Sequence, residues 1–122
     1  MGLEFDANKP IYLQLIHRIS SEIVRGDKRE GEKLPSVREY AVEVGVNTNT
    51  ISRVYRELEL LQIVTTKRGQ GTFVTEDVNR LTRLREEMKQ EQIKQFIMDM
   101  QEMGFSINEM LEGIMNNGSE GQ

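Results

Sequence analysis

Residues 40–54 read YAVEVGVNTNTISRV, and their apolar positions have the spacing of two helices that cross at a tight turn. Ala41 is small enough to let the second helix cross the first closely. Gly45 can adopt the positive φ angle that ends a helix and begins a sharp corner. This spacing is typical of the helix-turn-helix, so it favours DNA as the ligand.

Two helices are predicted on the N-terminal side of this corner. Pro10 suits the first turn of a helix, and the apolar residues after it recur at three- and four-residue steps. The charged, glycine-containing run DKREGEK at 27–33 predicts an exposed loop. Ser36 and Glu39 then have the spacing of a capping box, which predicts a second helix that begins there and runs to Val44.

The helix after the corner has the clearest pattern in the chain. The polar run at 47–50 supplies capping side chains, and apolar residues then form one stripe along a helix over 48–62. At about 100° per residue, the opposite side of that helix carries polar and basic residues. These are Asn49, Ser52, Arg53 and Arg56. Such a helix buries one face and presents a basic face to solvent.

A short hairpin is predicted after the third helix. Residues 63–66 (IVTT) and 72–75 (TFVT) are β-branched and aromatic runs that flank KRGQG at 67–71. They predict two strands joined by a basic, glycine-rich tip, which is the wing of a winged helix-turn-helix. We expect this domain to occupy residues 1–75. The expected fold class is mainly α with a small β-hairpin, followed by a short helical tail.

The remaining sequence predicts a two-helix tail over residues 76–117. Glycine and proline are absent from 77–103 while apolar residues recur, which favours a long helix. The step of five residues between Met88 and Ile93 breaks a strict heptad. We therefore expect bundle-like packing or a bend rather than a long coiled coil.

A second helix of the tail is predicted after Gly104. Ser106 and Glu109 repeat the capping-box spacing, and a short amphipathic pattern follows. The polar residues 118–122 are expected to be disordered.

The net charge of −4 is distributed unevenly along the chain. Residues 1–75 hold 11 Lys and Arg against 10 Asp and Glu, whereas residues 76–122 hold 5 against 10. The acidity therefore belongs to the tail. Because the local field decides phosphate attraction, the negative total does not exclude DNA binding.

Composition excludes several other classes of site. The chain has no cysteine and a single histidine, His17, so disulfides, thiolate metal sites and histidine clusters are excluded, and we expect no cofactor. No segment approaches the roughly 20 apolar residues of a membrane span, so we expect a cytoplasmic protein with no membrane partner. Glycine-rich phosphate loops and nucleophile motifs are missing, so we do not expect an enzyme.

Three segments supply the predicted DNA-binding residues. The third helix fits a major groove, the start of the second helix can hold a phosphate, and the glycines of the wing permit close approach to the DNA backbone. A merely solvated helix face, a serine that only caps and an ordinary tight hairpin are the alternative interpretations. The predicted set is Ser36, Arg38, Thr48, Asn49, Thr50, Ser52, Arg53, Arg56, Lys67, Arg68, Gly69, Gln70 and Gly71.

The apolar side of the tail is too large for two short helices to bury alone, so we expect a second copy of the chain to cover it. Dimerisation would also place two third helices at half-sites about one DNA turn apart. A methionine-rich pocket for a small molecule is the alternative. The predicted dimerisation residues are Leu81, Leu84, Met88, Ile93, Phe96, Ile97, Met100, Met103, Phe105, Ile107, Met110, Leu111 and Ile114.

Residues 34–74 read LPSVREYAVEVGVNTNTISRVYRELELLQIVTTKRGQGTFV, and this run resembles the DNA-binding domain of the GntR family of bacterial transcription regulators. The shared motifs are the L-P-S-x-R opening, the G-V-x-x-x-T turn, the Y-R-E-L-E stretch and the G-x-G-T-F-V strand. With the preceding P-I-Y-L-Q-L helix, the resemblance covers roughly residues 10–75. The short tail is similar to that of the YtrA subfamily, whose members use it for dimerisation and often regulate transporter operons.

The resemblance implies roles for individual residues. Arg38 matches an arginine that contacts operator DNA, residues 48–50 match the contacting run that opens the recognition helix, and Gly69 matches the glycine at the wing tip. Many relatives carry an arginine where this run begins with threonine. We therefore expect base readout to shift to Asn49 and Arg53.

These observations together predict a dimeric repressor that occupies a palindromic site on double-stranded operator DNA and blocks polymerase. That it represses rather than activates is implied by the family resemblance. One alternative is an adaptor whose third-helix face meets an acidic protein. Another is a ligand-sensing regulator with a pocket in the tail. Steep salt dependence of duplex binding would distinguish a DNA-binding protein from the adaptor. The sequence does not identify a small-molecule effector.

Overall fold

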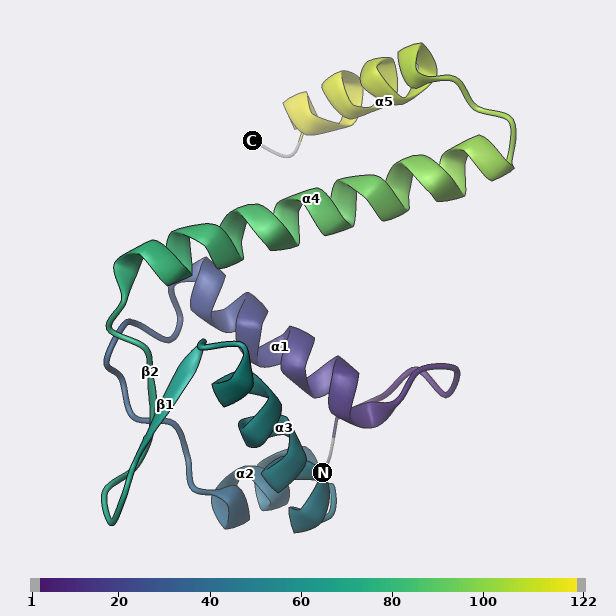
Figure 1. Ribbon diagram of the computed structural model, residues 1–122. Coiled ribbons are helices and arrows are strands. Elements are labelled where there is room, and N and C mark those ends of the chain that lie inside the picture. The colour runs from purple at the N-terminus through teal and green to yellow at the C-terminus, as the bar shows by residue number, and fades with distance from the viewer. Residues whose placement is uncertain (1–2, 121–122) are drawn as a thin grey trace. The chain divides into compact units, whose positions relative to one another are not determined.

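The computed structural model describes residues 3–120 (Figure 1). Within these residues the order of elements is α1 (Ile11–Arg25), α2 (Val37–Val44), α3 (Thr48–Leu60), β1 (Val64–Lys67), β2 (Gly71–Val74), α4 (Val78–Glu102) and α5 (Ile107–Glu120). Two compact units divide after Arg85. The first holds three helices, the hairpin and the start of α4, and the second holds the rest of α4 and α5. The predicted class, mainly helical with a small hairpin, is confirmed.

Local caps place the two helices of the corner as the sequence predicts. The backbone N–H of Glu39 donates to Ser36 Oγ at 3.1 Å, and the backbone N–H of Ser36 donates to Glu39 Oε1 at 2.8 Å, so the capping box that begins α2 is complete. Gly45 ends α2 with φ 74°, in the left-handed region that the corner requires. Asn47 Oδ1 accepts the N–H of Asn49 at 2.7 Å and caps α3.

The third helix ends slightly earlier than predicted. We expected it to reach residue 62, but α3 ends at Leu60 because Gln62 adopts φ 64°. The N–H of Ile63 then donates to the carbonyl of Leu58 at 2.9 Å, which closes the corner into β1.

The core of the first unit is built by α1, α2 and α3. Leu15 and Ile19 of α1, Tyr40 of α2, and Ile51 and Leu58 of α3 are all almost fully buried. Burial of each such side chain stabilises the fold by roughly 1.5–3 kcal/mol. Desolvation raises the pKa of Tyr40 to about 12, so its phenol stays neutral in the core.

An additional strand-like segment supports the hairpin. β1 and β2 pair antiparallel, in a register that runs from Val64 opposite Val74 to Lys67 opposite Gly71. Residues 31–34 run along the free side of β2, where Val74 N–H donates to the carbonyl of Glu32 at 2.8 Å and Leu34 N–H donates to that of Thr72 at 2.8 Å. The charged run at 27–33, predicted as a loop, therefore ends in residues that lie beside β2 and bond to the wing.

The first two turns of α4 belong to the first unit, which thus extends beyond the expected boundary at residue 75. Arg80 Nε donates to the carbonyl of Leu61 at 2.8 Å, and Arg85 Nη1 donates to that of Val24 at 2.9 Å. Leu84 is only 5% exposed. Its assignment to a dimer surface is wrong, because it is buried within the chain.

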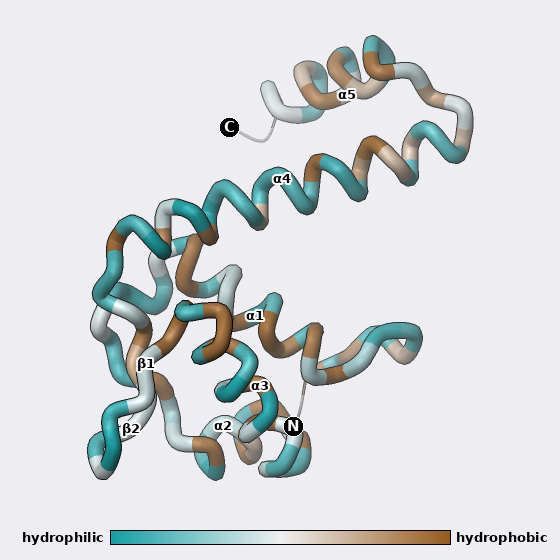
Figure 2. The backbone as a smooth tube through the Cα atoms, viewed as in Figure 1, coloured by the Kyte–Doolittle hydropathy of each residue, from teal (hydrophilic) through white to brown (hydrophobic). Residues whose placement is uncertain are grey.

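The second unit is a helical hairpin. The rest of α4 is hydrophilic over much of its length, while hydrophobic residues recur along α5 (Figure 2). The predicted capping box begins α5, since Ser106 N–H donates to Glu109 Oε1 and Glu109 N–H donates to Ser106 Oγ, each at 3.1 Å. Residues 118–120 of the expected disordered end are helical, and residues 121–122 lie outside the described part of the chain. In residues 3–120, no helix is long and apolar enough to cross a membrane.

Candidate nucleic-acid interface

α3 has two chemically distinct faces. Ile51, Val54 and Leu58 are fully buried against the rest of the first unit. On the other side, the predicted residues Thr48, Asn49, Ser52, Arg53 and Arg56 are exposed, and Thr50 is half-buried. A helix held by one face and polar on the other is shaped to enter a DNA major groove.

Arg53 is held against a neighbouring helix. Its guanidinium carbon lies 3.6 Å from the centre of the Tyr12 ring, which is contributed by α1. Tyr12 is one of the residues that recur at three- and four-residue steps after Pro10, and nothing in that local pattern indicates this contact. The stack fixes the position of one of the two arginines on the exposed face of α3.

The start of α2 places an arginine beside a capped helix end. Arg38 is exposed in the first turn of α2, where the backbone N–H groups give a partial positive charge. Ser36 is already engaged as the cap, and its hydroxyl accepts the N–H of Glu39. The backbone N–H of Ser36, with a smaller contribution from its side chain, lowers the pKa of Glu39 below its usual value.

The wing carries its basic residues at the tip. Lys67 Nζ lies 4.7 Å from the centre of the Phe73 ring, and Arg68 is exposed beside it. Gly69 turns the chain with φ 76°, and Gln70 is exposed next to it. Arg68, Gly69 and Gln70 form the tip of the hairpin, and Lys67, which pairs with Gly71, is the last residue of β1 beside that tip.

Sequence reasoning missed Lys33 as part of this surface. Gly71 has φ 127°, and a Cβ atom built there would lie 2.8 Å from Lys33 Cε. The lysine stem therefore crosses the wing over the bare glycine backbone. A third cation joins Lys67 and Arg68 at the hairpin, and the only sequence signal for it was a charged loop.

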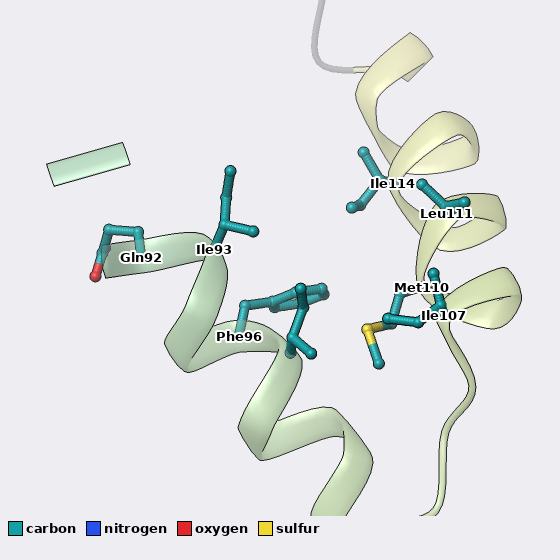
Figure 3. Close-up of a pocket in the computed structure, with 8 residues that line it drawn as sticks. Gln92, Ile93, Phe96, Ile107, Met110, Leu111 and Ile114 are labelled. Carbon is teal, nitrogen blue, oxygen red and sulfur yellow. The ribbon is translucent and has the colours of Figure 1, made fainter. Parts of the chain in front are cut away.

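The second unit carries a groove lined almost entirely by apolar side chains, which we call the tail groove. Its volume is about 450 Å³. Ile93 and Phe96 of α4 face Ile107, Met110, Leu111 and Ile114 of α5 across it (Figure 3). The full lining is Gln92, Ile93, Phe96, Ile97, Ile107, Met110, Leu111 and Ile114.

The predicted dimerisation residues divide into three groups in the structure. Leu84 and Met110 are buried within the chain, and Met110, which lines the tail groove, is only 3% exposed. The prediction that Met110 lies on a dimer surface is therefore wrong, as it is for Leu84, because the residue is buried within the chain. Half-buried residues are Leu81, Met88, Ile97 and Met100, and exposed residues are Ile93, Phe96, Met103, Phe105, Ile107, Leu111 and Ile114. Met98 and Met115, which we did not predict, are also exposed.

A three-helix core, a basic-tipped hairpin and an exposed polar face on the third helix define a winged helix-turn-helix transcriptional regulator. Residues 11–74 match the family model described as bacterial regulatory proteins, gntR family. The chain therefore belongs to the GntR family, as the sequence motifs indicated.

Two curated relatives match the chain over most of their length. The uncharacterized HTH-type transcriptional regulator YhcF of Bacillus subtilis is 46% identical over 93% of this chain and 94% of its own. The HTH-type transcriptional repressor YtrA of the same organism is 38% identical over 88% and 84%. The similarity thus extends beyond the winged domain into the tail.

Solved structures agree with this assignment. A GntR family transcriptional regulator from Listeria monocytogenes is 39% identical, with a TM-score of 0.86 over 92% of this chain and 98% of its own. The DNA-binding domain of AraR in complex with operator ORE1 is 32% identical, with a TM-score of 0.54 over 62% of this chain and 89% of its own. A related domain is therefore known bound to operator DNA.

Proposed function

We propose that the chain is a dimeric repressor that binds a palindromic operator through α3 in the major groove and the wing on the flanking backbone. The observation that carries this proposal is the division of α3 into a face that is fully buried and a face whose polar side chains are exposed. A related repressor, YtrA, and a related domain crystallised on its operator support it. We place the protein in the cytoplasm, at the nucleoid, as a regulator rather than an enzyme.

The contacts follow from the chemistry of each side chain. Arg53 and Asn49 can bond guanine and adenine edges, and the hydroxyls of the α3 start can bond bases or phosphates. Arg38 at the start of α2 and Arg56 of α3 carry charge for the phosphates. The wing residues Lys67, Arg68, Gly69, Gln70 and Gly71 lie against the sugar-phosphate backbone in this proposal, and Lys33 adds charge beside them.

The tail groove provides a surface for the second copy. It is nearly devoid of polar groups, and Phe96 and Ile114 on its rim are 41% and 54% exposed. An isologous pairing of two such grooves would bury this apolar surface. It would also fix two α3 helices at a set separation, which a palindromic operator requires.

Selection of duplexes from a random pool by the purified full chain tests the proposal. We expect the bound duplexes to share a palindrome, and the logarithm of affinity to fall steeply with the logarithm of salt concentration. If no duplex is retained at low salt, the adaptor alternative replaces this proposal. A recovered single half-site without symmetry would contradict the dimer.

Two arginine variants test the contacts on the selected duplex. Arg53→Ala is expected to lower affinity by about 1–3 kcal/mol and to relax preference at one base pair of each half-site. Arg38→Ala is expected to weaken binding uniformly across sequences and to reduce the salt slope by about 1 per half-site. Wild-type binding by both variants would contradict the placement of α2 and α3 on DNA.

The apolar character of the tail groove also supports a second candidate, a pocket for a small apolar ligand. A thermal-shift screen with the full chain distinguishes the two. A ligand that binds the groove should raise the melting temperature and change the affinity for the selected duplex, and Phe96→Ala should remove both effects. If the groove is filled by a second copy, no such ligand should bind the dimer.

A further inference from the structure

The structure pairs one arginine of the recognition face with a tyrosine from another helix. We propose that Tyr12 is a positioning residue for DNA recognition, whose ring holds the Arg53 guanidinium in the orientation that reads a base pair. This inference rests on the proposed function, in which α3 enters the major groove. It concerns α1, a helix that carries none of the predicted DNA-binding residues.

The geometry of the contact favours presentation of the arginine. The guanidinium carbon lies 3.6 Å from the centre of the Tyr12 ring. Stacking uses the flat face of a guanidinium, and its N–H donors lie in the plane and stay available. Within residues 3–120, the structure shows no hydrogen bond or ion pair from the Arg53 side chain to another residue. The ring therefore contacts the guanidinium of an exposed arginine without using its N–H donors.

The backbone that carries the tyrosine is itself braced. Tyr12 lies in the first turn of α1 and is half-buried. The side chain of Gln14 fastens the segment before this turn, because its Nε2 donates to the carbonyls of Asp6 at 2.8 Å and Lys9 at 2.9 Å. Its Oε1 also accepts the N–H of Asp6 at 2.9 Å. The Tyr12 ring is thus carried by a braced helix start, next to Arg53 of α3.

The Tyr12 ring affects the affinity for DNA by limiting the conformational freedom of the Arg53 side chain. Asn49 and Arg53 are four residues apart on α3, so both project from the same face. A free arginine loses rotamer freedom when it bonds a base, whereas one already stacked loses less. Loss of the Tyr12 ring should therefore weaken binding to the operator and reduce the sequence preference at the base pair that Arg53 contacts.

A double-mutant cycle tests this role. The dissociation constant is measured by fluorescence anisotropy on the duplex selected by the wild-type chain, for wild type, Tyr12→Leu, Arg53→Ala and the double variant. Tyr12→Leu is expected to raise the dissociation constant roughly two- to fivefold, and to add almost nothing once Arg53 is alanine. Tyr12→Phe, which keeps the ring, should bind within about 1.5-fold of wild type.

The matched control is Arg56, which is exposed on the same face of α3. The effects of Tyr12→Leu and Arg56→Ala should multiply, since the ring does not touch this arginine. If the leucine variant is unstable, Tyr12→Met replaces it in the same cycle. The duplex selection is then repeated with Tyr12→Leu. This variant should lose sequence preference at the same base pair as Arg53→Ala, an effect that general destabilisation would not produce.

The outcomes separate the two proposals. Independent effects of Tyr12 and Arg53, or tighter binding by the ring-less variant, would overturn the role of Tyr12 while leaving α3 as the reading helix. Tighter binding would mean that the ring holds the arginine away from DNA. If the wild-type chain selects no duplex, the proposed function fails and the role of Tyr12 fails with it.

Discussion

Arg80 Nε donates a hydrogen bond to the carbonyl oxygen of Leu61 across 2.8 Å, and this bond joins the first turn of α4 to the end of α3. Leu61 is the C-cap of α3, so a cation lies at the negative end of the helix dipole. Arg85 makes a similar contact with the carbonyl of Val24 in the last turn of α1. The start of α4 therefore holds two helices of the winged domain by their C-terminal ends.

Replacement of Arg80 should destabilise the first unit. Arg80→Leu keeps much of the buried aliphatic stem of a side chain that is only 6% exposed, but it removes the donor to Leu61. We expect a loss of about 1–3 kcal/mol in the free energy of unfolding, measured by urea denaturation. Arg83→Leu, at an exposed position of the same helix, is the control and should change it by less than about 0.5 kcal/mol. Equal effects would show that the bond to Leu61 contributes nothing.

The capping box of α2 predicts a pH dependence. The pKa of Glu39 is lowered chiefly by the backbone N–H of Ser36, so folding favours the ionised carboxylate. A group with a depressed pKa stabilises the fold above its unfolded pKa, and this contribution is lost as the pH falls through the folded pKa. The stability difference between wild type and Glu39→Gln should therefore be present at neutral pH, and it should shrink as the pH falls below the unfolded pKa of about 4.3 and through the lower pKa of folded Glu39.

Urea titrations at several pH values measure this difference, and an NMR titration of the Glu39 carboxyl gives its pKa directly. Glu43→Gln, on the same helix but outside the capping box, is the control for the loss of a carboxylate from α2. A Glu39 pKa at the value of an unfolded peptide would rule out the reciprocal bond.

The caps could be predicted from the sequence because each depends on residues three positions apart. Ser36 with Glu39 and Ser106 with Glu109 form the predicted bonds. The polar face of α3 followed in the same way from helical periodicity. The stack of Tyr12 on Arg53 could not be predicted, because it depends on how α1 crosses α3 and no local pattern encodes that crossing.

The boundary between the two units after Arg85 could not be predicted from the sequence either. A continuous helical pattern gives no sign of where packing on one core ends, so Leu84 was assigned to the tail although it is buried in the first unit. Lys33 was similarly taken for a loop residue. Its place across Gly71 depends on the pairing of residues 31–34 with β2, which joins segments far apart in the sequence.

Gly71 should be intolerant of any side chain. Its φ of 127° is strained for other residues, and a new Cβ would meet Lys33 Cε at 2.8 Å. Gly71→Ala is expected to cost about 1–3 kcal/mol of stability and to displace Lys33, with weaker binding to the selected duplex. Gly69→Ala is the matched control, because its φ of 76° imposes strain but a Cβ there meets nothing within 4 Å. Because Gly69 is itself part of the proposed DNA surface, stability is the deciding measurement, and equal losses of stability in both variants would mean that the contact with Lys33 adds nothing to the cost at Gly71.

Removal of the second unit should separate DNA contact from dimerisation. The sequence placed the end of the winged domain at residue 75, but Leu84 and Arg85 pack in the first unit, so the shortened chain should end after Arg85. We expect this fragment to fold as a monomer and to bind the selected palindrome roughly 100-fold more weakly or worse, because the two half-sites are no longer linked. Analytical ultracentrifugation gives its mass and anisotropy its affinity. A dimer that survives the cut would exclude the tail as the interface.

Two single substitutions make the same test in the full chain. Phe96 lines the tail groove and is 41% exposed, whereas Met98 is 54% exposed but does not line it. Phe96→Glu places a charge in the apolar surface that we assign to the second copy, where burial without a partner is costly, and should give a monomer. Met98→Glu adds the same charge two residues away on α4 and should leave the dimer intact. If both variants dissociate, the interface includes more of α4 than the groove, and if neither does, the two copies meet elsewhere.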